Sequence, residues 1–179
     1  VVKESEPPVL TTEVTTLAFA NEHAIQATAS GGDGIGVYEF SIDGGPWTMG
    51  VLNAEGDYDY TFNNVAAGEH VITARDANGC GETSELVLVM DYPLYFTPND
   101  DGYHDTWNIY GIDNQPDAKI FIFDRFGKLL KQLSPTGAGW DGTYNGNPMP
   151  TSDYWFTVDY REPGTDNKKS FKAHFTLKR

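Results

Sequence analysis

The chain of 179 residues is long enough for one ordinary domain or two small ones. Strand and turn formers dominate it, with 10 Tyr, 10 Phe, 19 Gly and 10 Pro, and no segment has the apolar spacing of an amphipathic helix. Of the net charge of −14, about −13 lies before Tyr92, where 15 acidic residues face 2 basic ones, and such a surface repels nucleic acid.

The first half of the sequence alternates between apolar and polar residues in short segments. Residues 1–13 are polar and contain two adjacent prolines, so we expect a linker there. Alternation follows in residues 24–30, 37–43, 58–62 and 70–76, with Gly- and Asp-rich turns between them. A continuous apolar run, residues 86–90, indicates a buried closing strand. This pattern predicts an immunoglobulin-like sandwich.

The second half repeats the pattern after a proline-containing joint at residues 91–98. It predicts a strand at residues 106–112, a hairpin at 118–133 with its turn at Gly127, and a last hairpin from strands 154–160 and 170–177. We therefore predict an all-β protein of two consecutive β-sandwich (Ig-like) domains, residues 1–91 and 92–179, the second being smaller. No apolar run approaches the roughly 20 residues that a helix needs to cross a bilayer, so no transmembrane segment is expected.

Residues 96–107 collect acids around one glycine and read FTPNDDGYHDTW. Asn99, Asp101 and Asp105 partly match the ligands of a calcium loop, but other residue types stand at its first and last ligand positions. We favour an Asx-rich turn in which Asn99 and Asp101 cap backbone N–H groups and Gly102 adopts a positive φ. Calcium held by Asn99, Asp101 and Asp105 is the alternative, and no other cofactor is expected.

No group of residues has the pattern of an active site. The four histidines are scattered, without a ligand pair such as HExxH, and no G-x-S-x-G elbow is present. His104 beside Asp105 is better explained as a solvated side chain than as an acid–base pair. Cys80, the only cysteine, lies in a turn without a local histidine and is expected to be inert. We predict that the protein is not an enzyme.

Aromatic residues of the second half allow two interpretations. Trp140, Tyr144, Tyr154 and Trp155 are flat and amphipathic, as in a sugar-binding platform. However, a domain of under ninety residues needs large aromatics for its own core. We favour the core interpretation, with tight turns at the Asp-Gly and Asn-Gly pairs of this segment.

Several fragments of the first half resemble SprB-type repeats, which are Ig-like modules of long bacterial surface adhesins. They are ATASGG, YEFSIDGGPW and NNVAAGEHVITARDANGC, within residues 17–90. Many such repeats carry a second cysteine near their start, and this sequence has none.

The second half resembles the gliding-motility-associated C-terminal domain, the type B sorting domain of the type IX secretion system in Bacteroidota. The match spans residues 93–179 and is carried, in order, by FTPNDDGYHDTWNIYGI, AKIFIFDRFGKLL, WDGTYNGNPMPTSDYWFTVDY and KKSFKAHFTLKR. The resemblance implies a domain that escorts a surface protein across the outer membrane. Its implied partners are the type IX machinery and then an outer-membrane β-barrel of the PorP/SprF-like type.

Together the two resemblances imply the tail of a secreted, cell-surface gliding adhesin. The alternative is a carbohydrate-binding accessory module of a secreted polysaccharide-degrading enzyme. We expect the partner to bind the terminal hairpin by strand addition, with basic groups steering it; edge protection by the lysines is the competing explanation. The predicted sorting residues are Lys168, Lys169, Phe171, Lys172, Phe175, Leu177, Lys178 and Arg179.

Overall fold

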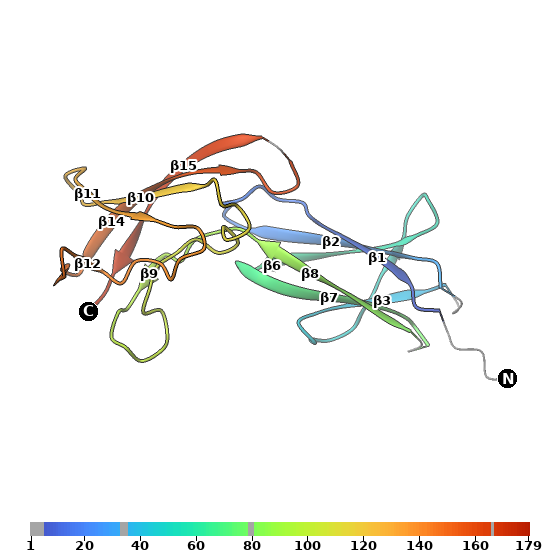
Figure 1. The fold of residues 1–179 in the computed structure, drawn as a ribbon. Helices are drawn as coiled ribbons and strands as arrows, with labels where there is room; N and C mark the ends of the chain where they lie inside the picture. Colours follow the sequence, from blue (N-terminus) through green and yellow to red (C-terminus); the bar gives the residue numbers. More distant parts are fainter. Residues whose placement is uncertain (1–5, 33–35, 79–80, 166) are drawn as a thin grey trace. The chain divides into compact units, whose positions relative to one another are not determined.

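A computed structural model describes residues 6–32, 36–78, 81–165 and 167–179. All regular elements within these ranges are β-strands, which confirms the predicted all-β class. The chain divides into two compact units, Val1–Val89 and Met90–Arg179 (Figure 1). No helix in the described part has the length and hydropathy to cross a membrane.

The first unit contains two four-stranded antiparallel sheets. One has the order β1 (Val9–Val14), β2 (His23–Ser30), β6 (Tyr58–Val65) and β5 (Val51–Leu52). The other has the order β4 (Thr48–Met49), β3 (Tyr38–Ile42), β7 (Gly68–Asp76) and β8 (Glu82–Val89). One hydrophobic core joins side chains from both sheets, as in a sandwich.

The strand faces of the first unit follow from the alternation of its residues. Ile25, Ala27 and Ala29 of β2 are fully buried, as the period of two predicts. Between β4 and β5 the chain passes from one sheet to the other at Gly50, where a Cβ would lie 2.6 Å from Cε2 of Phe40. The crossing therefore requires a residue without a side chain.

Two sequence predictions for the first unit were wrong. The expected linker of residues 1–13 overlaps β1, which begins at Val9 and pairs with β2 along its whole length. The cause is Leu10, whose burial in the core outweighs the polar residues around it. The run at residues 86–90 forms the end of β8 as far as Val89, but it is not buried on both faces, since Leu86 is 65% exposed while Val87 and Val89 are buried.

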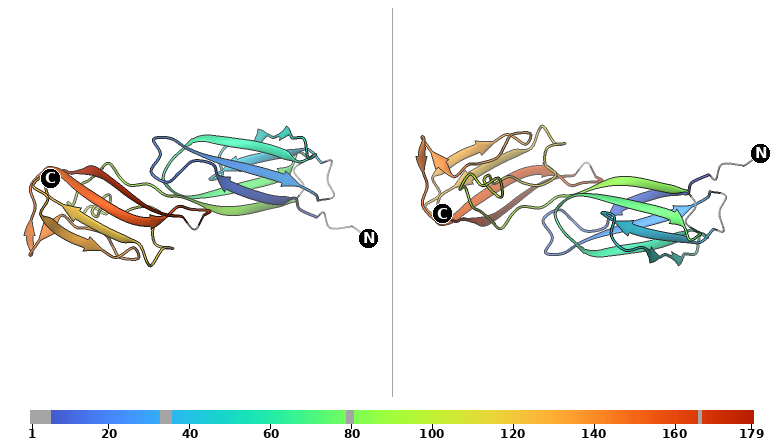
Figure 2. Two further views of the ribbon diagram at one scale, coloured as in Figure 1. Left: turned by 90° about the horizontal axis from the view of Figure 1, so that it is seen from above. Right: turned by 90° about the horizontal axis from the view of Figure 1, so that it is seen from below.

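The second unit has a five-stranded sheet with the order β11-β10-β14-β15-β9. These strands are β11 (Leu129–Leu133), β10 (Lys119–Phe123), β14 (Ser152–Arg161), β15 (Lys168–Leu177) and β9 (Tyr95–Phe96). All pairs are antiparallel except β15 with β9, which is parallel. Figure 2 shows the two longest strands, β14 and β15 in orange and red, side by side. The predicted hairpins at residues 118–133 and at the C-terminus are both confirmed.

One face of this sheet is covered by turns and short bridges. Trp107 and Trp140, both fully buried, pair with each other through their backbones. A small ribbon of β12 (Thr143–Tyr144) and β13 (Asn147–Pro148) follows, and Nε1 of Trp140 donates to the Thr143 carbonyl at 2.8 Å. Stacked on Trp107, Phe175 of β15 joins the sheet to these turns and bridges, with ring centroids 4.0 Å apart. The predicted strand at 106–112 is wrong, because only isolated bridges form there.

Candidate interaction surface at the terminal hairpin

The long hairpin of β14 and β15 forms the centre of the candidate site. Its register runs through ten residue pairs, from Ser152 opposite Leu177 to Arg161 opposite Lys168. At the turn the Glu162 N–H donates to the Asn167 carbonyl at 2.9 Å. Residues of odd number in β14 therefore share one face of the sheet with residues of even number in β15.

The outer edge of β15 is only partly covered by β9. The Thr176 N–H donates to the Leu94 carbonyl at 2.9 Å, and the Lys178 N–H donates to the Phe96 carbonyl at 3.0 Å. The pairing includes only Tyr95 and Phe96 of β9. β9 therefore covers only the C-terminal end of β15, and the rest of β15 forms the edge of the sheet.

Alternation along β15 identifies the groups on this uncovered edge. Since Thr176 and Lys178 point their N–H groups away from β14, so do the other residues of even number. Ser170, Lys172 and His174 are exposed, and no strand among the described residues pairs with them on that side. Their backbone donors and acceptors line an open edge of about three residue pairs.

The eight predicted sorting residues lie on one strand and its end, but in different environments. Phe175 and Leu177 are completely buried, and Phe171 is half-buried against Tyr92 and Phe156. These three side chains hold β15 on the core.

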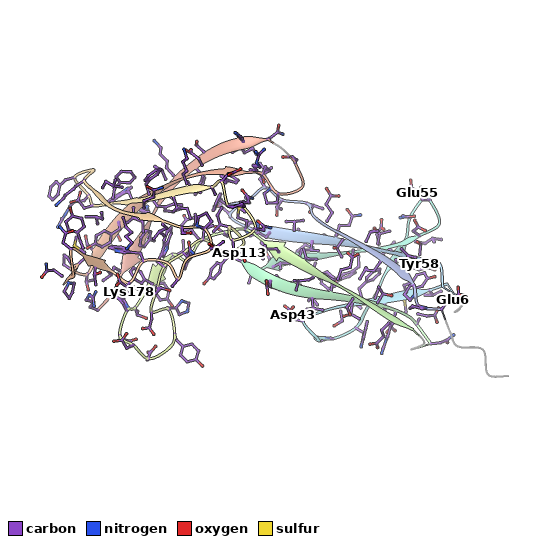
Figure 3. The ribbon with its side chains drawn as sticks, viewed as in Figure 1. Glu6, Asp43, Glu55, Tyr58, Asp113 and Lys178 are labelled. Carbon is purple, nitrogen blue, oxygen red and sulfur yellow. The ribbon has the colours of Figure 1, made fainter. Side chains whose placement is uncertain are left out.

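Three of the basic residues are engaged within the domain. Lys169 forms an ion pair of 2.9 Å with Glu162, a buried carboxylate. Lys178, labelled in Figure 3, places Nζ 4.1 Å from the ring centroid of Tyr95. The guanidinium of Arg179 donates to three backbone carbonyls, those of Met149, Pro98 and Gly142.

The other two lysines are free of such contacts. Lys168 and Lys172 are exposed, and neither has a carboxylate within 4.0 Å in the part of the chain that the structure describes. Both lie on the same face of β15 as Ser170 and His174. The nearest carboxylate across this face, Asp159, accepts a hydrogen bond from the Ser170 hydroxyl.

A groove of about 430 Å³ lies at the turn end of the hairpin. Its walls are residues 114–119, 159–161 and 168–170. The amide of Gln115 fixes one wall, because its Nε2 donates to the Arg161 carbonyl at 2.8 Å and its Oε1 accepts from the Arg161 N–H at 2.7 Å. This clamp joins residues 46 positions apart, so no local sequence signal indicated the groove.

The acidic stretch near residues 96–107 forms a closed set of Asx turns. Asp105 accepts from the N–H groups of Asn99, Asp100 and Gly102 at 2.7–3.0 Å, and Asp101 accepts from the Tyr103 N–H at 2.8 Å. The φ of Gly102 is 88°, as the turn interpretation predicted. Burial raises the pKa of Asp105, but the backbone hydrogen bonds outweigh it and leave the pKa below its ordinary value.

The calcium alternative has no independent support in this geometry. Within residues 6–32, 36–78, 81–165 and 167–179, no three His, Cys, Asp or Glu side chains are grouped to hold a metal ion. The oxygens of Asp105 already accept three backbone hydrogen bonds. Calcium binding by Asn99, Asp101 and Asp105 stays a prediction to be tested.

The aromatic residues considered for sugar binding separate into core and surface. Trp140 and Tyr154 are buried, which confirms the core interpretation, and their rings meet at 4.9 Å. Trp155 is 42% exposed on the open face of the sheet, 6.1 Å from the ring of His174. Cys80 lies outside the described residues.

One comparison with known protein families finds a match in the second unit. Residues 90–176 match the family described as the CHU_C type IX secretion signal domain. The C-terminal unit is therefore a type IX secretion signal domain, as its motifs predicted. Such a signal directs export and implies contact with the type IX secretion machinery. No curated protein matches the chain.

Three solved structures align with most of the chain at low similarity. Dimeric latent PorU from Porphyromonas gingivalis aligns with 95% of this chain at 18% identity and a TM-score of 0.30. The BSP domain of a biofilm associated protein aligns with 97% of this chain at 12% identity and a TM-score of 0.31. Three N-terminal domains of the bacteriophage RB49 capsid protein Hoc align with 96% of this chain at 12% identity and a TM-score of 0.29. The chain spans 20%, 29% and 59% of those structures, respectively.

Proposed function

We propose that this chain is the C-terminal part of a secreted cell-surface adhesin of a gliding bacterium of the Bacteroidota. In this proposal residues 90–179 direct type IX secretion and then anchor the protein at the outer membrane. The observation that carries the proposal is the family match over residues 90–176. The first unit, with its SprB-like motifs, serves as an acidic stalk repeat.

The proposed mechanism is recognition rather than catalysis. The terminal hairpin supports it, because it offers a partly uncovered strand edge and two exposed lysines, Lys168 and Lys172, without a carboxylate partner among the described residues. A PorP/SprF-like outer-membrane barrel is the proposed anchoring partner, reached after the secretion machinery.

The test is surface display of a reporter in a bacterium that has type IX secretion. Residues 90–179 are fused to the C-terminus of a fluorescent protein that is exported to the periplasm, and residues 6–89 are fused to the same reporter as the control. We expect protease-accessible reporter on the cell surface with the first fusion only. Equal display of both fusions, or retention of both, contradicts the proposal.

Anchoring is tested separately from secretion. The displayed fusion is purified from outer-membrane extract, and co-purified barrel proteins are identified by mass spectrometry. We expect a PorP/SprF-like barrel with residues 90–179 and none with a fusion that lacks residues 168–179. Reporter released quantitatively into the medium contradicts the anchoring role while leaving the secretion role intact.

A further inference from the structure

We propose that the open edge of β15, at Ser170, Lys172 and His174, binds an extended acidic segment of a partner protein as an additional strand. The inference rests on the proposed function, in that the partner belongs to the secretion or anchoring apparatus. It goes further by assigning the site, the binding mode and the chemical class of the ligand.

The chain itself demonstrates that this edge accepts an added segment. β9 reaches β15 from a part of the sequence more than seventy residues away and pairs with it in parallel through Thr176 and Leu177. β9 begins only at Tyr95, and in the described residues the same row of donors and acceptors continues without a partner strand toward Lys168. A partner strand would continue the ladder where β9 stops.

The side chains beside this edge define the preferred charge of the partner. Residues of even number in β15 have their side chains on the open face, so Lys168 and Lys172 project on either side of Ser170. An added strand places every second side chain beside them, about 4.5–5.5 Å away between Cβ atoms. Glutamate or aspartate at those positions would neutralise two lysines that lack a carboxylate within the described structure.

The charged groups around these lysines bear on the same preference. Lys169 is occupied by Glu162, and Asp159 is one strand further away and bonded to Ser170. The groove beside Lys168 is lined by Lys119 and Arg161 and also by Asp117 and Asp159, so its charges are mixed. The attraction for an acidic segment therefore comes chiefly from Lys168 and Lys172.

The opposite edge of the sheet provides a comparison. β11 is shorter, five residues, and its register with β10 shifts between Ile122 and Phe123. Such an irregularity twists an edge and discourages further pairing. Lys128 near this edge lies over the ring of Tyr144 at 4.4 Å, so it is already engaged.

The experiment uses the whole chain, labelled with ¹⁵N, and synthetic seven-residue peptides. The first peptide alternates valine and glutamate, the second alternates valine and lysine, and the third is the first with N-methylated backbone amides. We expect the glutamate peptide to shift the amide signals of Ser170, Lys172 and His174 and to bind about ten-fold more tightly than the lysine peptide. N-methylation should abolish binding, because it removes the donors of the ladder.

A charge reversal sharpens the test. The variant Lys168→Glu/Lys172→Glu should bind the glutamate peptide more weakly and the lysine peptide more tightly than the unchanged chain does. The control Lys128→Glu/Lys131→Glu changes the net charge by the same amount at the opposite edge and should bind both peptides as the unchanged chain does. Amide signals elsewhere in β14 and β15 report that each variant is folded. If the double reversal does not fold, Lys172→Gln replaces it, with an intermediate loss of affinity expected.

Three results overturn the inference. They are absence of shifts at the edge with millimolar glutamate peptide, equal binding of the two charged peptides, and full binding of the N-methylated peptide. In the first case the lysines only protect the edge from aggregation. Because binding is measured with the purified chain, its failure leaves the display experiment of the proposed function unaffected, and failed display leaves the peptide result standing.

Discussion

Asp43 and His70 link the turn after β3 to β7 in the first unit. Nδ1 of His70 lies 2.7 Å from one Asp43 oxygen, Nε2 lies 2.9 Å from the Ala66 carbonyl, and the second Asp43 oxygen accepts from the Val71 N–H. The ring of His70 is thus held between two oxygen atoms from different segments. Asp43 itself has a φ of 52°, in the left-handed region that aspartate adopts more readily than most residues other than glycine.

We predict that Asp43→Asn destabilises the first unit at neutral pH by about 1 kcal/mol. This value is below that of a hydrogen bond to a buried charged group, because Asp43 is half-exposed. Burial raises the pKa of Asp43, but the bonds from His70 and Val71 lower it more. A lowered pKa stabilises the fold above the unfolded value of about 4 and loses that effect as the pH falls below it.

The measurement is hydrogen exchange of the buried Ile72 amide, at pH 7 and near pH 3. The difference between the variant and the unchanged chain should shrink at the lower pH. Asp113→Asn, an exposed position labelled in Figure 3, is the control and should change nothing. A difference that grows on acidification contradicts the assignment.

Asp105 organises the turn at residues 97–106 through its three backbone hydrogen bonds. We predict that Asp105→Asn speeds amide exchange at Gly102, since an amide accepts these bonds less strongly than a carboxylate. Neither EDTA nor added calcium should change the melting temperature of the unchanged chain. A calcium-dependent rise that Asp101→Asn removes would establish the metal alternative instead.

At the scale of elements, β15 is fixed at its end by contacts that leave no room for a side chain beneath it. A Cβ on Gly142 would lie 2.7 Å from Cδ1 of Leu177 and 3.1 Å from a guanidinium nitrogen of Arg179. Gly146 has a similar positive φ, 77° against 75°, and open space around it. Comparing substitutions at Gly146 and Gly142 therefore distinguishes the cost of backbone strain from the cost of a steric clash.

We predict that Gly146→Ala costs about 1 kcal/mol of stability and Gly142→Ala about 2–3 kcal/mol, because the second variant adds overpacking to the same strain. Urea unfolding of the second unit measures both. In the display experiment only Gly142→Ala should reduce surface reporter. Equal costs for the two variants would mean that Leu177 and Arg179 move aside freely.

The buried carboxylate of Glu162 closes the turn of the terminal hairpin. We predict that Lys169→Met destabilises the second unit by about 2 kcal/mol, since it leaves a buried charge with less compensation, and that Glu162→Gln/Lys169→Met recovers most of the loss. Lys169 is 37% exposed, which keeps the cost below that of a fully buried pair. A double variant as unstable as the single one contradicts this account.

The phenol of Tyr160 gives an independent measurement at the same turn. Burial and the neighbouring Glu162, to which its hydroxyl donates at 3.2 Å, raise the pKa of Tyr160 to about 12. In Glu162→Gln the last part of the absorbance change of ionising tyrosines, at the highest pH, should therefore move to lower pH. An unchanged titration would mean that burial alone sets the value.

Alternation of apolar and polar residues in the sequence predicted the strands that have one buried and one exposed face. The structure of the other segments depends on contacts between residues far apart in the sequence. In β14 the residues Tyr154, Phe156 and Val158 are buried and Trp155 is exposed, so the period of two is visible in the sequence. Residues 106–112 have the same local pattern but bond to distant partners, as Trp107 does to Trp140. The pairing of β15 with β14 was predictable as a hairpin, whereas the short cover of β15 by β9 depends on a contact between residues about eighty positions apart.

At the scale of the whole molecule, the two units differ in net charge and in the composition of their cores. The first unit carries nearly all of the net charge of −14, whereas the aromatic core around Trp107, Trp140 and Phe175 lies wholly within the second. A secretion signal that works on its own must fold without the protein that precedes it. The core composition of the second unit is suited to this requirement, since large aromatic residues bury much area in a short chain.

We therefore predict that residues 90–179 fold when expressed alone. The ¹⁵N spectrum of this fragment should reproduce the signals of β10, β14 and β15 in the whole chain, and its melting temperature should lie within a few degrees of the corresponding transition. Residues 98–179, which lack β9, provide the matched control and should be less stable, because Phe96 is fully buried and β9 pairs with β15. An unfolded 90–179 fragment would mean that the first unit is needed for the second to fold, and it would remove the basis for treating the C-terminal domain as a transferable signal.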